Sequence, residues 1–196
     1  FDSELCGKIL SQIKQKQSNL WNDYFETKNK LTVEEIIKKK TMISINEYFY
    51  GKSRLYLVAP LHASNCIHPV YKWAQGVDIR IDVEPLFKLS YQELKKAMLK
   101  TPKFLRTIRS NKAPIIIDSS YAMKAEPYNA ISAEILKKRA EMVKSNAKFA
   151  QDVCSILKEL ADEKKDTSSQ LDIEPEESIY QGGFTSDKDK ILFSKF

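Results

Sequence analysis

The chain is short of glycine, proline and cysteine: its 196 residues include 5 Gly, 7 Pro and 3 Cys. So few glycines and prolines argue against a low-complexity chain, and the sequence contains no internal repeat. The cysteines, Cys6, Cys66 and Cys154, are odd in number and far apart, with no C-x-x-C pair. This pattern favours a reducing compartment over a disulfide framework, so we expect a cytoplasmic protein.

Long hydrophobic runs are also missing. No apolar stretch approaches the ~20 residues that a membrane-spanning helix needs. Charged residues (Asp2, Glu4 and Lys8) interrupt the start, where a signal peptide would be apolar. We therefore expect no membrane association, while a hydrophobic share of 42% is enough for an ordinary core.

Complete catalytic and phosphate-binding motifs are absent: the sequence has no G-x-S-x-G, P-loop or HExxH pattern. His62, Cys66 and His68 lie close together, but structural zinc needs four ligands and no second cluster supplies the others. We interpret that stretch as a loop. Asp2 and Glu4 share an expected helix and could hold a metal only with partners from elsewhere. Taken alone, they are typical of a solvated first turn.

Positive charge exceeds negative charge, with a formal net charge of +6 and a pI near 9.0. This favours an anionic partner such as nucleic acid, an acidic peptide or an anionic membrane, although ordinary surface lysines give the same excess. The basic residues gather in three runs: Lys28, Lys30, Lys38, Lys39 and Lys40; Lys95, Lys96, Lys100, Lys103, Arg106, Arg109 and Lys112; and Lys137, Lys138, Arg139, Lys144 and Lys148. Aromatic residues that could stack on bases are interleaved with the basic ones, at Tyr24, Phe25, Tyr48, Phe49 and Tyr50. From these residues alone, core aromatics and solvated helix faces remain the favoured interpretation.

The clearest local pattern lies in residues 77–98. Apolar and charged residues alternate over 77–83, which predicts a strand with one buried face. Pro85 ends the ladder because proline has no N–H to donate. Ser90 and Glu93 then form a capping box, which predicts a helix to about Lys100.

The rest of the chain alternates helices with short strands. Helices are expected at 2–16, from Ser18, from a capping box of Thr32 and Glu35 to residue 40, and over 133–163 with a break at 145–146. Short strands are expected at 42–45, 48–50, 55–59, 105–108 and 113–117. These elements predict an α+β fold with an antiparallel, barrel-like sheet and flanking helices. Residues 163–178 lose all periodicity and become acidic, which predicts a linker.

Both ends of the chain fall within expected helices. The chain opens on Phe1, already in helical pattern, and closes soon after a cap at Ser186. We therefore expect it to be the middle of a longer protein.

Four ordered segments, LYLVAPLH, VDIRIDVEPLFKLSYQELKKAM, NKAPIIID and IYQGGFTSDKD, resemble bacterial exodeoxyribonuclease I. The resemblance runs through essentially the whole chain. It implies an enzyme of DNA repair and recombination that degrades single-stranded DNA processively from the 3′ end. It also implies four parts: the last helix of a DnaQ-like nuclease domain (1–17), an SH3-like domain (18–165), an acidic linker (166–177) and the start of a C-terminal helical domain (178–196).

The resemblance implies one metal ligand in this chain. The family holds two divalent metals, usually Mg²⁺, through four acidic residues, with a His as general base. The last of these acids opens the final helix in a D-x-x-A-T-like stretch, and Asp2 occupies that place, followed by Leu5 and Cys6 instead of Ala and Thr. The other ligands would lie upstream, so the chain alone is expected to be inactive.

The resemblance also implies two partners for a monomeric protein. Single-stranded DNA is expected to contact a set of lysines: Lys28, Lys30, Lys38 and Lys112. The acidic, Phe-ending tail of single-stranded-DNA-binding protein is expected to meet Lys40, Lys124 and Lys144. Asp23 and Asp118 stand where the family's pocket has an aromatic and an amide, which should weaken an acidic tail's binding. The alternative from another class is a non-catalytic SH3-like module that binds nucleic acid or an acidic peptide.

Overall fold

The computed structural model describes residues 2–49, 51–61 and 73–169. The chain divides into two compact units, Phe1–Glu159 and Leu160–Phe196. Every element below belongs to the first unit, except the end of the last helix. The described residues form helices around one antiparallel sheet, so the predicted α+β class is confirmed.

The sheet is open and has five strands in the order β4-β3-β2-β1-β5. Every neighbouring pair is antiparallel, and β4 and β5 are the edges. The strands are β1 (Ile43–Phe49), β2 (Lys52–Pro60), β3 (Ala74–Asp78), β4 (Leu105–Ile108) and β5 (Ile115–Ile117). The two short strands expected at 42–50 are thus one strand, β1. It pairs with β2 through a tight turn at Gly51, whose φ of 75° suits a residue without a Cβ.

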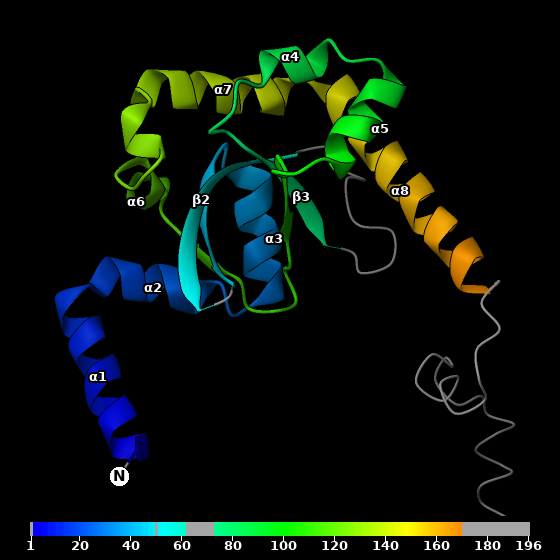
Figure 1. Cartoon of the computed structure of the whole chain (residues 1–196). Helices are drawn as coiled ribbons and strands as arrows, with labels where there is room; N and C mark the ends of the chain where they lie inside the picture. The colour runs from blue at the N-terminus through cyan, green and yellow to red at the C-terminus, as the bar shows by residue number, and fades with distance from the viewer. Residues whose placement is uncertain (1, 50, 62–72, 170–196) are drawn as a thin grey trace, which may run out of the picture. The chain divides into compact units, whose positions relative to one another are not determined.

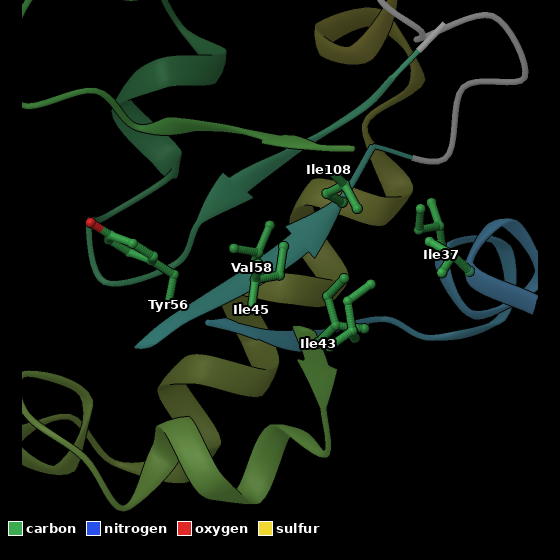
Figure 2. Close-up of a cluster of buried hydrophobic side chains, with 8 residues drawn as sticks. Ile37, Ile43, Ile45, Tyr56, Val58 and Ile108 are labelled. Carbon is green, nitrogen blue, oxygen red and sulfur yellow. The ribbon is translucent and has the colours of Figure 1, made fainter. Parts of the chain in front are cut away.

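One face of the sheet packs against α3 (Lys30–Lys39). Alternate residues of β1 and β2 point to this face, as the period of a strand requires. They join residues of α3, β4 and β5 in one buried cluster: Val33, Ile37, Ile43, Ile45, Tyr56, Val58, Ile108 and Ile116. Figure 2 shows Ile37 extending from α3 toward this group. Burial of these apolar side chains is the main force that holds α3 on the sheet.

The opposite face is covered by α6 (Ser119–Met123) and α7 (Ala133–Ser145) (Figure 1). Ser44 on β1 is fully buried on this side. Its hydroxyl donates to the carbonyl of Asp118 at 3.0 Å and accepts from the amide of Ala122 at 3.2 Å. The serine therefore satisfies two backbone groups at the start of α6 and ties that helix to the sheet.

The strand predicted over 77–83 is largely wrong, because β3 ends at Asp78. The buried carboxylate of Asp78 accepts hydrogen bonds from the amide of Arg80 at 3.1 Å and the hydroxyl of Tyr128 at 2.8 Å. The guanidinium of Arg139 on α7 donates to the carbonyls of Ile79 and Arg80 at 3.1 and 3.0 Å. Side chains thus form hydrogen bonds with backbone groups of Ile79 and Arg80 that would otherwise pair with a neighbouring strand, and the chain turns at these residues.

The other helices are α1 (Asp2–Lys16), α2 (Ser18–Glu26), α4 (Glu84–Phe87), α5 (Tyr91–Leu99), a 3₁₀ turn (Tyr128–Ala130) and α8 (Ala147–Ser169). The capping box of α5 is confirmed: the amide and hydroxyl of Ser90 donate to Glu93 Oε2 at 2.9 and 2.6 Å. These bonds lower the pKa of Glu93. The box expected at Thr32 is wrong, because α3 begins earlier, and Asn29 caps it by accepting from the amide of Leu31.

The predicted break at 145–146 separates α7 from α8, and Asn146 caps α8 through the amide of Phe149. Helix α8 continues to Ser169, through the first part of the acidic stretch. The remainder of the expected linker, the 178–196 unit and the loop with His62, Cys66 and His68 lie outside the described residues.

Cys6 is exposed and free. Within the described segments, no helix combines the length and apolarity needed to cross a membrane.

Gly76 on β3 tests how tightly the strands pack. A Cβ at this position would collide with a side-chain methyl of Val58 and come within 3.0 Å of the carbonyl oxygen of Ala59. Gly76→Ala should therefore lower the free energy of unfolding by about 1–3 kcal/mol, as overpacking does. Urea denaturation would measure it. Gly7→Ala on α1, where a Cβ meets nothing within 4 Å, should cause no loss; equal losses in both variants would contradict the packing described.

Candidate functional sites

The predicted metal ligand Asp2 lies in the first turn of α1 and is exposed. Glu4, its neighbour on the helix, pairs with Lys8 at 2.9 Å. Among the described residues, no group of three or more His, Cys, Asp or Glu side chains could hold a metal ion. The residues described here do not fit a two-metal centre, and the role of Asp2 stays a prediction.

A basic hollow of about 420 Å³ lies beside β1 and β4. We use the name basic hollow for the space lined by Ile45, Asn46, Glu47, Tyr48, Lys103, Leu105, Arg106, Thr107, Ile108, Arg109, Lys112 and Pro114. Four of these side chains are cationic and one is a carboxylate. The excess of positive charge suits an anionic ligand such as a phosphate chain.

Arg106 is built into the wall of the basic hollow. Its guanidinium stacks 3.7 Å from the ring centre of Tyr56 and lies 3.7 Å from Glu47 Oε2. It also lies 3.9 Å from Asp78 Oδ2. Burial raises the pKa of Glu47, and the charges of Arg106 and Arg109 partly offset that effect. Arg106 is therefore committed to internal partners.

The other three cations of the hollow, Lys103, Arg109 and Lys112, are exposed. Exposed aromatic surface lies beside them: Tyr48 is 72% exposed. The guanidinium of Arg109 lies 5.1 Å from the ring centre of Trp73. Exposed cations beside aromatic rings are typical of surfaces that bind a single nucleic-acid strand.

Of the four lysines predicted to contact DNA, Lys112 lines the basic hollow. The other three lie on or beside α3. Lys28 lies over the ring of Phe25 at 3.6 Å, and Lys30 pairs with Glu34 at 3.7 Å. Lys38 is in the last turn of α3, where it favours the helix C-terminus. All four cations that line the basic hollow belong to the basic run 95–112. Periodicity alone could not show which residues of that run lie together.

A small apolar pocket of about 150 Å³ lies where α2, α3, β1 and β5 meet. We use the name apolar pocket for the space lined by Asp23, Glu26, Ile36, Lys40, Met42, Ile43, Ile116, Ile117, Asp118 and Ser119. The structure thus brings together Lys40, Asp23 and Asp118, which the resemblance placed at one site. Lys144 reaches Thr41, the neighbour of Lys40, with its Nζ 3.4 Å from the threonine hydroxyl.

Lys124, the third residue expected at this site, follows α6 directly as its C-cap. It does not line the apolar pocket. The volume of the pocket is well below the roughly 300–1,000 Å³ of small-molecule sites. The pocket has room for one apolar side chain.

Asp23 and Asp118 are bound to the backbone at the edge of the apolar pocket. Asp23 Oδ2 accepts from the amide of Asp118 at 2.9 Å, and Asp118 Oδ1 accepts from the amide of Ser120 at 2.9 Å. Asp118 is therefore the N-cap of α6. The bonds to Ser120, and then the charge of Lys40, lower the pKa of Asp118. Both residues thus have a structural role that the sequence did not reveal.

Asp118→Ala should lower the free energy of unfolding by about 1 kcal/mol, because it removes an N-cap. Asp118→Asn should keep most of that stability, since an amide oxygen can accept the same bond. The folded pKa of Asp118 is lowered, so its contribution is present above the unfolded pKa of about 3.9 and is lost as pH falls through the folded value. Urea titrations at neutral and acidic pH would measure both effects. Equal stability of Asp118→Ala and the unmodified chain would rule out the cap.

No protein-family model matches the chain, and no curated protein matches its sequence. Solved structures do match in fold. An ExoI/SSB-Ct complex is 17% identical with a TM-score of 0.64, over 95% of this chain and 40% of that one. Exonuclease I from Methylocaldum szegediense is 17% identical with a TM-score of 0.64, and the match covers 95% of this chain and 39% of that one. E. coli exonuclease I in complex with a dT13 oligonucleotide is 18% identical with a TM-score of 0.61, and the match covers 95% of this chain and 41% of that one. The chain therefore has the fold of part of an exonuclease I, and it spans about two fifths of the length of the proteins it matches.

Proposed function

We propose that this chain is part of a 3′–5′ single-stranded-DNA exonuclease of the exodeoxyribonuclease I type. Residues 18–165 would be its SH3-like domain, 1–17 the last helix of its nuclease domain and 178–196 the start of its C-terminal helical domain. The observation that carries the proposal is the fold match over 95% of the chain to exonuclease I structures, including one with dT13. The order of the four resembling segments supports it independently.

The basic hollow is the proposed contact with single-stranded DNA. Lys103, Arg109 and Lys112 would meet phosphates, and Tyr48 would stack on a base. Phosphate contacts give affinity without sequence preference, which suits an enzyme that degrades any sequence. Lys28, Lys30 and Lys38 are proposed as a second group of phosphate contacts near α3.

Replacement of the three exposed cations of the hollow by Ala should weaken binding of oligo-dT and flatten its salt dependence. For single strands, each neutralised phosphate contributes about −0.7 to the slope of log K against log salt, so losing three contacts should change the slope by about 2. Fluorescence anisotropy over a range of salt would measure it. The matched control replaces Lys137, Lys148 and Lys158, which are exposed on α7 and α8. If both triple variants lost the same affinity and salt dependence, net charge alone would explain the binding of oligo-dT.

Two Mg²⁺ ions are the proposed cofactors of the whole enzyme, and they would act on the attacked phosphate and on water. From this chain only Asp2 is proposed as a ligand. The described residues contain no further cluster to complete the site.

The chain by itself should therefore fail to shorten 3′-labelled single-stranded DNA in Mg²⁺, because one carboxylate cannot hold two ions. Denaturing gels over several hours would show this. Mononucleotide release that disappears in Asp2→Ala would mean that the metal site is complete within the chain, against the domain boundaries proposed.

The apolar pocket is proposed to dock the C-terminal tail of single-stranded-DNA-binding protein, with Lys40, Lys144 and Lys124 as its cations. One matched structure is an ExoI/SSB-Ct complex. The pocket supports the proposal because it has room for one apolar side chain beside Lys40.

A non-catalytic SH3-like binding module remains a second candidate. Both the hollow and the pocket are formed by residues 23–119, whereas catalysis would need groups from elsewhere. The sequence of the parent protein before Phe1 separates the two: an exonuclease requires a D-x-E motif and a His shortly before Asp2.

A further inference from the structure

Glu47 on β1 is the only carboxylate among the described residues that line the basic hollow. It follows Ile45 by two positions, so the period of a strand places both side chains on the same face of the sheet. The Glu47 side chain is 21% exposed, and its Oε2 lies 3.7 Å from Arg106 Nη1. A largely buried negative charge therefore lies inside a hollow whose other charged residues are cations.

Arg106 is held in place without a hydrogen bond to either of its carboxylate neighbours. Its Nη1 lies 3.7 Å from Glu47 Oε2 and its Nη2 lies 3.9 Å from Asp78 Oδ2, and both distances are longer than a hydrogen bond. Its Nε also has no hydrogen-bond partner in the described part of the chain. The stack on the Tyr56 ring fixes the plane of the guanidinium. Arg106 is thus oriented, and its Nη1 can still donate to an oxygen of a ligand.

We propose that Glu47 sets the affinity of the basic hollow for single-stranded DNA, because its carboxylate occupies the place beside Arg106 that a phosphate of the strand would take. The inference rests on the proposed contact between the hollow and DNA. While Glu47 is charged, phosphates meet Lys103, Arg109 and Lys112 and are repelled by the carboxylate among these cations. Once that charge is removed, Arg106 becomes a fourth phosphate contact, since charge-assisted bonds from a guanidinium to phosphate are strong.

The charges around Glu47 set the sign of its response to pH. Burial raises its pKa, the charge of Asp78 raises it further, and the arginines of and after β4 lower it, with a net upward shift. Glu47 therefore loses its charge at a higher pH than an ordinary glutamate, and the hollow should bind DNA more tightly as pH falls. The charged groups that line the hollow or lie beside Glu47 are Arg54, its cross-strand partner on β2, and Asp78, Lys103, Arg106, Arg109 and Lys112.

Glu47→Gln tests the proposal, because it removes the charge and keeps the shape of the side chain. It should bind labelled oligo-dT at least about threefold more tightly than the unmodified chain, since like charges repel strongly in a partly desolvated site. One additional phosphate contact should also steepen the slope of log K against log salt by about 0.7. Urea denaturation would confirm that the variant is folded. Glu47→Met removes the same charge with a side chain of similar length and gives a second test.

Glu141→Gln is the matched control. It changes the net charge by the same amount at an exposed position on α7, which covers the opposite face of the sheet. It should leave the salt slope unchanged. Glu47→Gln combined with Arg106→Gln restores the net charge of +6 and should return the slope to that of the unmodified chain. A double variant that kept the steeper slope would overturn the role of Arg106, and equal tightening in Glu47→Gln and Glu141→Gln would leave only net charge.

A pH series separates an electrostatic role of Glu47 from a structural one. Oligo-dT has no group that titrates between about pH 7 and about pH 5, so a change in affinity over this range comes from the protein. The affinity of the unmodified chain should rise more than that of Glu47→Gln as pH falls. Parallel profiles of the two proteins would overturn the inference.

The failures of the two proposals can be distinguished with the Ala variant of Lys103, Arg109 and Lys112. If that variant binds oligo-dT more weakly while Glu47→Gln binds like the unmodified chain, the DNA contact stands and the role of Glu47 is wrong. If the triple variant binds as tightly as the unmodified chain, the hollow is not the DNA contact, and the inference fails with it.

Discussion

The buried carboxylate of Asp78 is the constraint on which the centre of the molecule depends. Asp78 is fully buried, and an ionised carboxyl group in such a place is costly unless it is paired and hydrogen-bonded. Its Oδ1 accepts hydrogen bonds from the Tyr128 hydroxyl and the Arg80 amide. Its Oδ2 has no hydrogen-bond partner in the described part of the chain. The guanidinium groups of Arg80 and Arg106 form ion pairs with Oδ2 at 3.7 and 3.9 Å. Burial and the charge of Asp78 raise the pKa of Tyr128, so its hydroxyl remains a donor.

This network links the end of β3 to the basic hollow. Arg106 lies near Asp78 Oδ2 without donating a hydrogen bond to it. The same guanidinium stacks on Tyr56 and lies near Glu47. The hollow is therefore lined by one cation that contacts internal partners, Arg106, and by three exposed cations.

Local patterns in the sequence predicted those features that depend on neighbours in the chain. The capping box at Ser90 and the break at Asn146 are of this kind, because their bonds span three residues. The strand over 77–83 failed because Arg139, about 60 positions away, binds the carbonyls of Ile79 and Arg80. The hollow and the pocket could not be derived from periodicity for the same reason. The resemblance, not the pattern, suggested that Asp23 and Asp118 share a site, and their backbone bonds appeared only in three dimensions.

The floor and the rim of the apolar pocket are under different constraints. Ile43 and Ile116 line the pocket and also belong to the core cluster under α3. A cavity for one apolar side chain is therefore maintained wherever the fold itself is maintained. The rim needs acceptors for two backbone amides at Asp23 and Asp118, and either a carboxylate or an amide can supply them. Rim charge can thus change while the fold and the pocket stay intact.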